Sequence, residues 1–385
     1  MGVRSIRFYD LLAVRHVEAG RSTRLLWPAP LDPVPTAAHL ALASAWQDVN
    51  ETVFTFVRRE RGTLTGFAQA TARPARDAWD LVRLAAAPGD ARDGGDVERE
   101  QALADIVDEL LEALLRATAG RGGLRVFARA EAGGVGQEWL GRRGFRRYTD
   151  EYTLAAVGLD VTPAPLPDHL ALRARRPADA WGIFQLYCSA APPEVRHAEG
   201  LSSKRWGRGS LAASTLDRLR RPREIVLDDE GMIVGWLRLA GRTARQPQRL
   251  EVMLHPRAGD VLPAFLAHAV VALEIRRDQR TVCQVRAYED AVLHGLRRAG
   301  FAEVGAHALL VKHAAARVTE RQLLLAALRA QSLGLDVSRY RQSATPRPWE
   351  PREPGDPRSR PRPTHSGLIP SPRVGITTLE HTHHD

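Results

Sequence analysis

Residues 125–145 read RVFARAEAGGVGQEWLGRRGF, and residues 281–301 read TVCQVRAYEDAVLHGLRRAGF. Each stretch is a short apolar run followed by a helical pattern that stops at Gly-Phe. The two align without a gap, because 281 − 125 and 301 − 145 both equal 156. A repeat at that separation has the size of a domain and not of a solenoid unit. The sequence therefore predicts one fold built twice.

A second pair of matching segments lies upstream of the first pair. Residues 63–73, TLTGFAQATAR, match residues 232–242, MIVGWLRLAGR, so that Gly66 corresponds to Gly235 at a separation of 169. The first copy therefore carries extra residues between Gly66 and Val126. The Pro/Gly/Asp stretch APGDARDGGD, residues 87–96, is the best place for them.

The length of the chain and its repeat indicate a globular protein with two domains. The 385 residues have room for two or three domains of roughly 150 residues each, and the repeat selects two. No apolar run approaches the roughly 20 residues that a membrane span needs. The N-terminus has Arg7 and Asp10 within its apolar part, so it does not read as a signal peptide. We expect a cytoplasmic protein that does not associate with a membrane.

The net charge of +10 invites a nucleic-acid hypothesis, which the detail of the sequence disfavours. The only lysines are Lys204 and Lys312, so the positive charge is nearly all arginine, as a GC-rich coding sequence would give. The arginine clusters are short and interleaved with apolar residues. Attraction to an acidic small ligand is equally compatible. The two cysteines, Cys188 and Cys283, lack the spacing of a disulfide framework or a zinc site, and we expect no metal.

Along the chain, predicted strands and helices alternate in an α/β order that is typical of a mixed sheet covered by helices. The first copy has predicted strands at 53–57, 65–71, 80–85 and 124–128 and a long helix at 96–120. The second has predicted strands at 170–173, 224–227, 232–239, 250–254, 282–285 and 308–311, and helices after Pro177 and at 261–277. The predicted organisation is a domain at 1–156, a linker at 157–166, a domain at 167–315, a helix at 316–340 and a disordered Pro/Arg-rich tail at 341–385.

The strand and helix ending in Gly-Phe, together with the hairpin whose second strand carries Gly-Phe or Gly-Trp, resemble the GCN5-related N-acetyltransferase (GNAT) superfamily and its tandem members. The resemblance covers residues 1–156 and 167–313. It implies two acyl-CoA N-acyltransferase domains, with acetyl-CoA bound where two neighbouring parallel strands splay apart, before the long helix. The free N–H groups and dipole of a helix N-terminus suit a pyrophosphate there. The implied acetyl-CoA residues are Met253, Leu254, Arg257 and Gly259 in the second copy and Leu84, Arg92, Gly94 and Gly95 in the first.

Both loops depart from the family's pattern of Arg or Gln, two residues, Gly, one residue, and Gly or Ala. Residues 255–262, HPRAGDVL, offer one glycine beside Arg257 and the unhelpful Asp260. Residues 87–96 carry three aspartates, which would repel a pyrophosphate unless Arg92 or Arg99 offset them. An eroded surface loop is an equal alternative in each copy.

The positions of the family's catalytic tyrosine and asparagine are also altered. The tyrosine five residues before the Phe of Gly-Phe is replaced by Leu140 and Leu296, and the asparagine twelve residues before it by Gly133 and Glu289. A leucine cannot act as an acid, so the reaction needs another proton donor. Tyr288, on the same predicted helix of the second copy, is our candidate, with core packing as the alternative.

Acetyl transfer also needs a base that takes a proton from the substrate ammonium. In the family, a glutamate on the strand before the long helix is one solution, and Glu251 holds that place in the second copy. The alternative is a strand glutamate that faces solvent.

The resemblance implies transfer of an acetyl group from acetyl-CoA, a substrate, to a small-molecule amine or a peptide N-terminus by direct attack. The acceptor is not identified, because its specificity lies in stretches such as residues 192–209, where the sequence predicts no regular structure. The competing hypothesis is a non-catalytic GNAT-like binding or dimerisation module that has lost the phosphate loop and the general acid. A homodimer is one option that the sequence leaves open.

Overall fold

The computed structural model describes residues 2–14, 23–26, 28, 35–45, 52–73, 77–87, 96–159, 161, 164–201, 203, 206, 223–240, 247–276 and 278–313. All of them belong to one compact unit, Met1–Arg317. The predicted helix at 316–340 and tail at 341–385 lie outside the described residues. No helix in the described part of the chain is long and apolar enough to cross a membrane.

From residue 53 onward the elements of the first copy follow the predicted order, with strands that extend beyond their predicted ends, whereas the strand Thr23–Leu26 and the helix Ala37–Ala45 were not predicted. They are β1 (Gly2–Ser5), η1 (Phe8–Asp10), β2 (Thr23–Leu26), α2 (Ala37–Ala45), β3 (Val53–Glu60), β4 (Thr63–Ala72), β5 (Ala78–Ala86), α3 (Asp96–Gly120), β6 (Arg125–Glu131), α4 (Val135–Arg142) and β7 (Arg146–Val157).

The second copy has no described counterpart of β2 but otherwise has a similar order, with a short helix, α6, in a stretch where the sequence predicted no regular structure. Its elements are β8 (Leu170–Ala174), η2 (Pro177–Asp179), α5 (Ala180–Ala190), α6 (Pro193–Glu199), β9 (Arg223–Asp229), β10 (Met232–Ala240), β11 (Gln248–Leu254), η3 (Pro256–Val261), α9 (Leu262–Ala272), β12 (Arg280–Arg286), α10 (Asp290–Arg298) and β13 (Ala302–His313).

The predicted hairpin turns are present in both copies. Arg61 and Gly62 turn the chain between β3 and β4 with φ of 46° and 86°, and Glu230 and Gly231 do so between β9 and β10 with φ of 48° and 96°. Two successive residues with positive φ form the turn whose twist matches that of the flanking strands. The glycine in the second position accepts this conformation without a steric penalty.

The described strands form one mixed sheet. Its order is β1-β3-β4-β5-β6-β13-β7-β12-β11-β10-β9-β8, and β2 pairs with β5 outside this path. Only the pairs β5–β6 and β11–β12 are parallel. Each copy therefore contributes one parallel pair, which is followed in sequence by a helix that ends at Gly-Phe.

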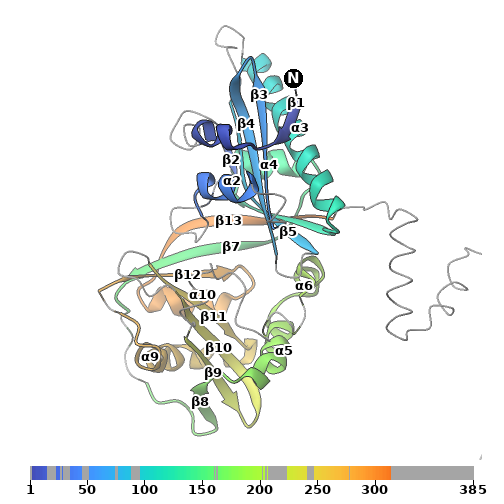
Figure 1. Ribbon diagram of the computed structural model, residues 1–385. Helices are drawn as coiled ribbons and strands as arrows, with labels where there is room; N and C mark the ends of the chain where they lie inside the picture. Colours follow the sequence, from blue (N-terminus) through green and yellow to red (C-terminus); the bar gives the residue numbers. More distant parts are fainter. Residues whose placement is uncertain are drawn as a thin grey trace, which may run out of the picture. The chain divides into compact units, whose positions relative to one another are not determined.

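The last strands of the two copies are exchanged. β13, from the end of the second copy, pairs with β6 of the first, from His307↔Glu131 to His313↔Arg125. β7, from the end of the first copy, pairs with β12 of the second, from Arg280↔Val157 to Arg286↔Glu151. β7 and β13 also pair with each other, as Figure 1 shows. The bounds 1–156 and 167–315 follow the sequence repeat, but each copy's part of the sheet is completed by the other copy's last strand.

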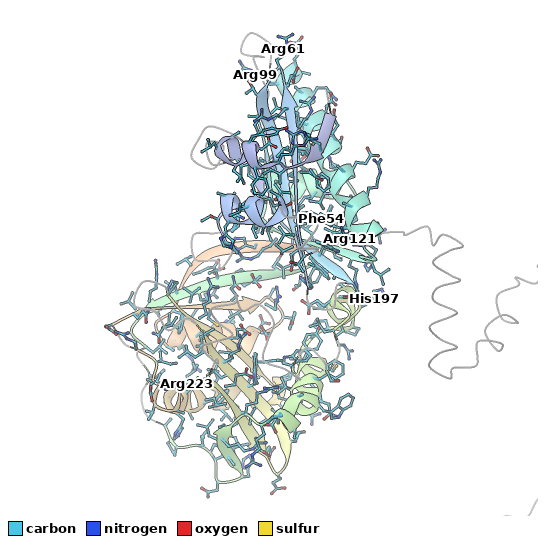
Figure 2. The ribbon with its side chains drawn as sticks, viewed as in Figure 1. Phe54, Arg61, Arg99, Arg121, His197 and Arg223 are labelled. Atoms are coloured by element: carbon cyan, nitrogen blue, oxygen red, sulfur yellow. The ribbon has the colours of Figure 1, made fainter. Side chains whose placement is uncertain are left out.

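Each copy has its own core, built by one long helix against the sheet. In the first copy, the buried residues of α3 include Ile106, Leu110 and Leu114, which lie at the helical spacing seen in the sequence. Phe54 of β3 stacks on Trp79 with ring centroids 4.7 Å apart. Arg121, just after α3, lies 5.6 Å over the ring of Phe54 (Figure 2).

In the second copy, α9 and α5 pack on opposite faces of the sheet. Leu262, Phe265 and Leu266 of α9 join one core cluster, which includes Leu254 of β11. A separate cluster combines Ile183, Leu186 and Tyr187 of α5 with Met253, the residue before Leu254 on β11. Successive strand residues point to opposite faces, so β11 contributes to both cores. α6, marked by His197 in Figure 2, follows α5.

Candidate active site

Both parallel pairs splay apart at their carboxyl ends. In the second copy, the ladder between β11 and β12 runs from Gln248↔Thr281 to Leu250↔Cys283 and ends there, although β11 continues to Leu254. In the first copy, the ladder between β5 and β6 ends at Leu81↔Ala128, although β5 continues to Ala86. The splayed strands that the resemblance implies are therefore present twice.

In the first copy the splay is occupied by the chain itself. β2 pairs antiparallel with the end of β5 through Thr23↔Ala86, Arg24↔Ala85 and Leu26↔Leu84. Leu25 and Leu26 are only 6% and 3% exposed. Leu84, a predicted acetyl-CoA residue, is fully buried between Ala68 of β4 and Leu26 of β2. The backbone edge of β5 at the splay is taken by β2.

A glycine makes room for β2 beneath α4. A Cβ atom on Gly136 of α4 would lie 1.6 Å from the carbonyl oxygen of Leu25. The residue 156 positions further on is Val292, whose side chain is buried in the second core. This difference between two aligned helices was visible in the sequence, but nothing in the sequence related it to a strand. Arg92, Gly94 and Gly95 lie outside the described residues.

In the second copy no described strand occupies the splay: the neighbours of β11 are β10 and β12 alone. The loop after β11 is the short helix η3, which runs directly into α9. Its backbone donors are partly used within the loop, because the N–H of Arg257 donates to His255 Nδ1 at 3.3 Å and that of Ala258 to the His255 carbonyl at 2.8 Å. A Cβ atom on Gly259 would lie 3.0 Å from Cβ of Ala291, so the loop closely approaches α10.

The side chain of Arg257 lies beside a cavity at this end of the sheet. The cavity has a volume of about 650 Å³ and is lined by His169, Leu170, Ser189, Asp229, Met232, Val234, His255, Pro256, Arg257, Ala258 and Val261. It lies on the side of β11 that faces β10, whereas the splay lies on the side that faces β12.

Glu251 lies on β11 opposite Arg238 of β10, and its Oε1 accepts a hydrogen bond from Arg238 Nη1 at 2.8 Å. Arg238 is only 3% exposed. Glu224 of β9 lies near the same guanidinium, 4.0 Å from its Nε. A buried guanidinium needs such counter-charges, because an unpaired buried charge is costly. In the structure, the side chain of Glu251, the predicted base, therefore helps to balance the buried charge of Arg238.

Tyr288 does not lie on the helix where the sequence placed it. It belongs to the turn between β12 and α10, because α10 begins only at Asp290 and Glu289 is its N-cap residue. The ring is partly buried beside the α5 cluster. Burial, and then the charge of Glu289, raise the pKa of Tyr288 above its ordinary value, so the phenol stays protonated at neutral pH.

Glu289 stands at the position of the family's asparagine, and the sequence suggested no role for it. Its side chain does not cap α10; Oε2 instead accepts a hydrogen bond from the backbone N–H of Arg286 at 3.0 Å. Burial raises the pKa of Glu289 to about 7, although the Arg286 hydrogen bond and charge act in the opposite direction. A carboxyl group with this pKa exchanges a proton readily near neutral pH.

Next to these two residues lies a nearly buried charge network on the face of the sheet that carries α5 and α6. Arg286, at the end of β12, lies 2.7 Å from Glu151 Oε2 of β7 and 3.6 Å from Glu199 Oε1 of α6. Glu151 also pairs with Arg129 of β6 at 2.7 Å. Tyr148 of β7 donates its hydroxyl to Glu199 at 3.5 Å. The exchanged strand β7 thus brings residues of the first copy to the candidate site of the second.

Cys283, at the apex of the splay, is 1% exposed. Burial raises the pKa of its thiol well above the ordinary value, so it is held as a neutral thiol and is not poised as a nucleophile. Leu140 and Leu296, which replace the family tyrosine, are buried in the cores of their copies. No group of three or more His, Cys, Asp or Glu residues in the described part of the chain could hold a metal ion.

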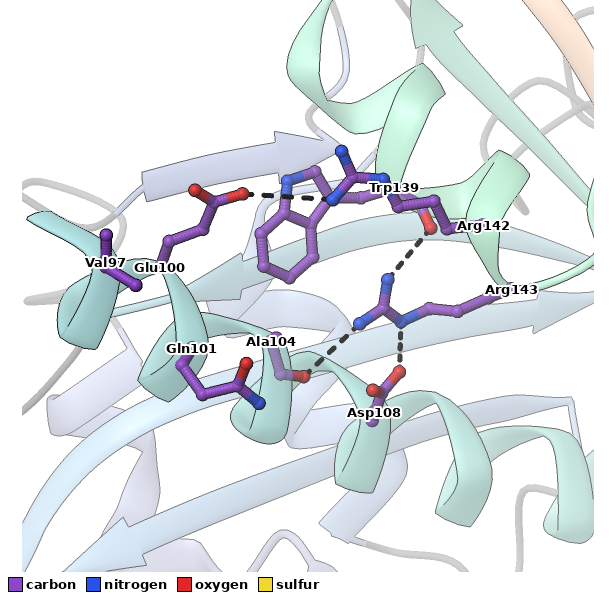
Figure 3. Close-up of a pocket in the computed structure, with 8 residues that line it drawn as sticks. All are labelled: Val97, Glu100, Gln101, Ala104, Asp108, Trp139, Arg142 and Arg143. Atoms are coloured by element: carbon purple, nitrogen blue, oxygen red, sulfur yellow. Dashed lines mark hydrogen bonds and ion pairs between the residues drawn. The ribbon is translucent and has the colours of Figure 1, made fainter.

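The first copy has a cavity of its own between α3 and α4, shown in Figure 3. Its volume is about 610 Å³. It is lined by Val97, Glu100, Gln101, Ala104, Asp108, Trp139, Arg142 and Arg143. Arg142 lies 2.5 Å from Glu138 and 3.8 Å from Glu100, and Arg143 pairs with Asp108. Both guanidiniums therefore already have carboxylate partners within the domain.

No protein-family model and no curated protein matches the sequence. Among solved structures, the chain is similar to a GCN5-related N-acetyltransferase from Sphaerobacter thermophilus, at 17% identity over 81% of this chain and 95% of that chain, with a TM-score of 0.48. It is also similar to a tandem GNAT protein from the clavulanic acid biosynthesis pathway, at 12% identity over 81% of this chain and 98% of that chain, again with a TM-score of 0.48. By its own strand order, this chain is built from two copies that each contain one splayed parallel pair, as the resemblance of its repeat to tandem GNAT proteins implies.

Proposed function

We propose that this chain is an acyl-CoA-dependent N-acyltransferase with a single reaction centre, located at the splay between β11 and β12. One observation carries the proposal. Glu289, with a pKa of about 7, and the protonated phenol of Tyr288 stand together where β12 leaves this splay. The corresponding splay of the first copy is occupied by β2. The acyl donor is therefore assigned to the second copy, with acetyl-CoA as the first donor to test.

The backbone of β11 beyond Leu250 would bind the donor. Beyond the last residue pair of the β11–β12 ladder, the edge of β11 that faces β12 is no longer paired with that strand. An extended pantetheine chain carries amides that can form hydrogen bonds with such an edge, as a strand would. In the first copy, β2 makes this kind of pairing with β5. Met253 and Leu254 are buried on opposite faces of β11 and fix the strand in place.

Glu289 would act as the general base and Tyr288 as the general acid. Glu289 takes a proton from the substrate ammonium, and the free amine attacks the thioester carbonyl. When the carbon–sulfur bond breaks, Tyr288 gives its proton to the departing thiolate. The second proton, released from nitrogen as the amide forms, restores the phenol, and Glu289 releases to solvent the proton that it took. A base with a pKa near the working pH is the most efficient for the first step.

Calorimetry with acetyl-CoA tests the donor site. We expect one binding event per chain in the micromolar range, and a Tyr288→Phe chain that binds the donor but releases CoA more slowly in the presence of an amine. Absence of heat with both CoA and acetyl-CoA, together with no CoA release across a panel of amines, would refute the function. Two equivalent sites per chain would refute the single centre.

A non-catalytic binding module is the second candidate function. It is favoured by the occupation of the first splay by β2 and by the internal use of the N–H groups of Arg257 and Ala258 in the loop of the second copy. If the wild-type chain acylates any amine and the Glu289→Gln chain does not, the non-catalytic binding module is ruled out. Donor binding without turnover would decide for it.

A further inference from the structure

A groove runs from the candidate reaction centre along β7 toward α6. Its volume is about 490 Å³. It is lined by Arg147, Tyr148, Thr149, Asp150, Pro192, Glu194, Val195, Ala287 and Tyr288. We call it the β7–α6 groove. Tyr288, the proposed general acid, is one of its walls, so a molecule lying in the groove has one end at the reaction centre.

The β7–α6 groove is composite. Four of its lining residues come from β7, the last strand of the first copy, and the others come from the second copy. β7 reaches this place because it pairs with β12 up to Arg286↔Glu151, after which the N–H of Ala287 donates to the carbonyl of Asp150 at 2.9 Å. The strand exchange therefore builds this groove, and neither copy forms it alone.

The side chains that line the groove carry a net charge of −1, from two carboxylates and one guanidinium, although the chain has a net charge of +10. Asp150 and Glu194 supply two carboxylates, and Arg147 is the one guanidinium among the lining residues, where it is ion-paired with Asp150. Glu194 is exposed in the first turn of α6. Carboxylates that line a concave surface concentrate cations and repel anions.

Two tyrosines add a second feature that suits a cation. Tyr148 and Tyr288 both line the groove. Burial raises the pKa of each phenol, so both rings stay neutral at physiological pH. The face of a neutral aromatic ring attracts an organic cation, and the attraction grows when water is excluded. Pro192 supplies apolar surface that suits the carbon chain of such a molecule.

We infer that the acceptor amine carries a second positive charge, which the β7–α6 groove binds through Glu194 and the ring of Tyr148 while the reacting amine lies near Tyr288. This inference rests on the proposed function and names its substrate class: diamines and amines with a further ammonium or guanidinium group. An acceptor with a carboxylate at that end would meet Glu194, which is not balanced by the Arg147–Asp150 pair, and be repelled.

Three acceptors of equal chain length test the inference: an alkyl diamine, the matching amino alcohol and the matching amino acid. We expect the diamine to have the lowest KM, by about five-fold relative to the amino alcohol, and the amino acid the highest. Glu194→Gln should reduce the preference of the diamine over the amino alcohol, because the ring of Tyr148 remains, and Glu194→Lys should reverse it. The value of kcat should change little, because Glu194 does not touch the reacting atoms.

Glu138→Gln and Glu138→Lys are matched controls, since Glu138 also lies in the first turn of a helix but on α4, away from the groove. They should leave the order of KM values unchanged. Equal KM values for the three acceptors in the wild-type chain would overturn the inference while leaving the acyltransferase function intact.

If no amine is acylated, the proposed function fails and binding decides the inference separately. In that case the diamine should still bind to the wild-type chain in a calorimetric titration, and Glu194→Lys should weaken that binding at least five-fold. Diamine binding that is absent, or that Glu194→Lys does not change, would overturn the inference.

Discussion

At the scale of single residues, the position of Glu289 at the turn between β12 and α10 determines its chemistry. Burial raises its pKa from an ordinary 4.5 to about 7. The native state therefore holds this proton more tightly than the unfolded chain does. The resulting stabilisation is fully present below pH 4.5 and is lost as the pH rises through about 7. The same residue thus connects the stability of the fold with the proposed reaction.

Glu289→Gln should remove both effects. We expect kcat/KM of the wild-type chain to rise with pH through an apparent pKa of about 7, because the deprotonated base is the active form. The variant should have a flat profile, lowered by about 10²–10⁴-fold, which is the usual contribution of a positioned base. Its stability relative to the wild type should increase as the pH rises from 5 to 8, as measured by urea unfolding.

Glu251→Gln provides the contrast on the neighbouring strand. Glu251 is paired with the buried Arg238, so its loss should lower stability and leave the pH dependence of turnover unchanged. A pH profile that is lost with Glu251 and kept in Glu289→Gln would assign the base to Glu251 instead.

The sequence identified these three residues to different degrees. The aligned repeat shows Glu289 at the family's asparagine position, but the pKa of Glu289 depends on its burial, which cannot be read from the sequence. The sequence predicted Tyr288 on the helix, because the spacing of apolar residues does not show at which residue a helix begins. Glu251 was found as a strand residue, and its partner Arg238 lies on a different strand.

At the scale of elements, β2 is the feature that distinguishes the two copies. β2 consists of four residues, TRLL, which pair with the edge of β5 and bury Leu25 and Leu26. Gly136 of α4 permits this, because any side chain there would meet the Leu25 carbonyl. A four-residue strand without a turn signal cannot be recognised by periodicity, so the sequence predicted neither β2 nor its pairing with β5.

Gly136→Val should therefore destabilise the first copy. The variant introduces the residue type found at the corresponding position of the second copy, and the overpacking should cost about 1–3 kcal/mol or more. Gly141→Ala, on the same helix, has no atom within 4 Å of its new Cβ and should stabilise the chain by about 0.5–1 kcal/mol. Urea unfolding measures both. An unchanged midpoint for Gly136→Val would contradict the placement of β2.

At the scale of the whole described unit, the exchange of β7 and β13 joins the two copies into one sheet. The repeat predicted two copies and most of their strands, and the structure contains them. It could not predict the exchange, because strands that follow the same Gly-Phe helix have similar patterns and can complete either sheet. Which edge a strand joins is decided by contacts distant in sequence, such as those of Glu151 with Arg129 and Arg286.

Separating the copies tests this arrangement. A fragment of residues 1–160 keeps β7 but lacks its partner β12, and its β6 has no β13. We expect this fragment to aggregate or to unfold without cooperativity, because unpaired strand edges promote association. Co-expression with residues 161–317 should give a soluble complex of the two fragments, measured by co-purification and circular dichroism. A monomeric 1–160 fragment that unfolds cooperatively would contradict the need for exchange.

The position of β13 also has a consequence for the order in which this protein can fold. Domains of a growing chain generally fold one after the other, starting from the N-terminus. Here the edge of β6 is covered only by β13, the last of the described strands to be synthesised. The first copy therefore leaves the ribosome with an open edge and retains it while the entire second copy is translated. During that interval the unpaired edge of β6 is exposed to association with other chains.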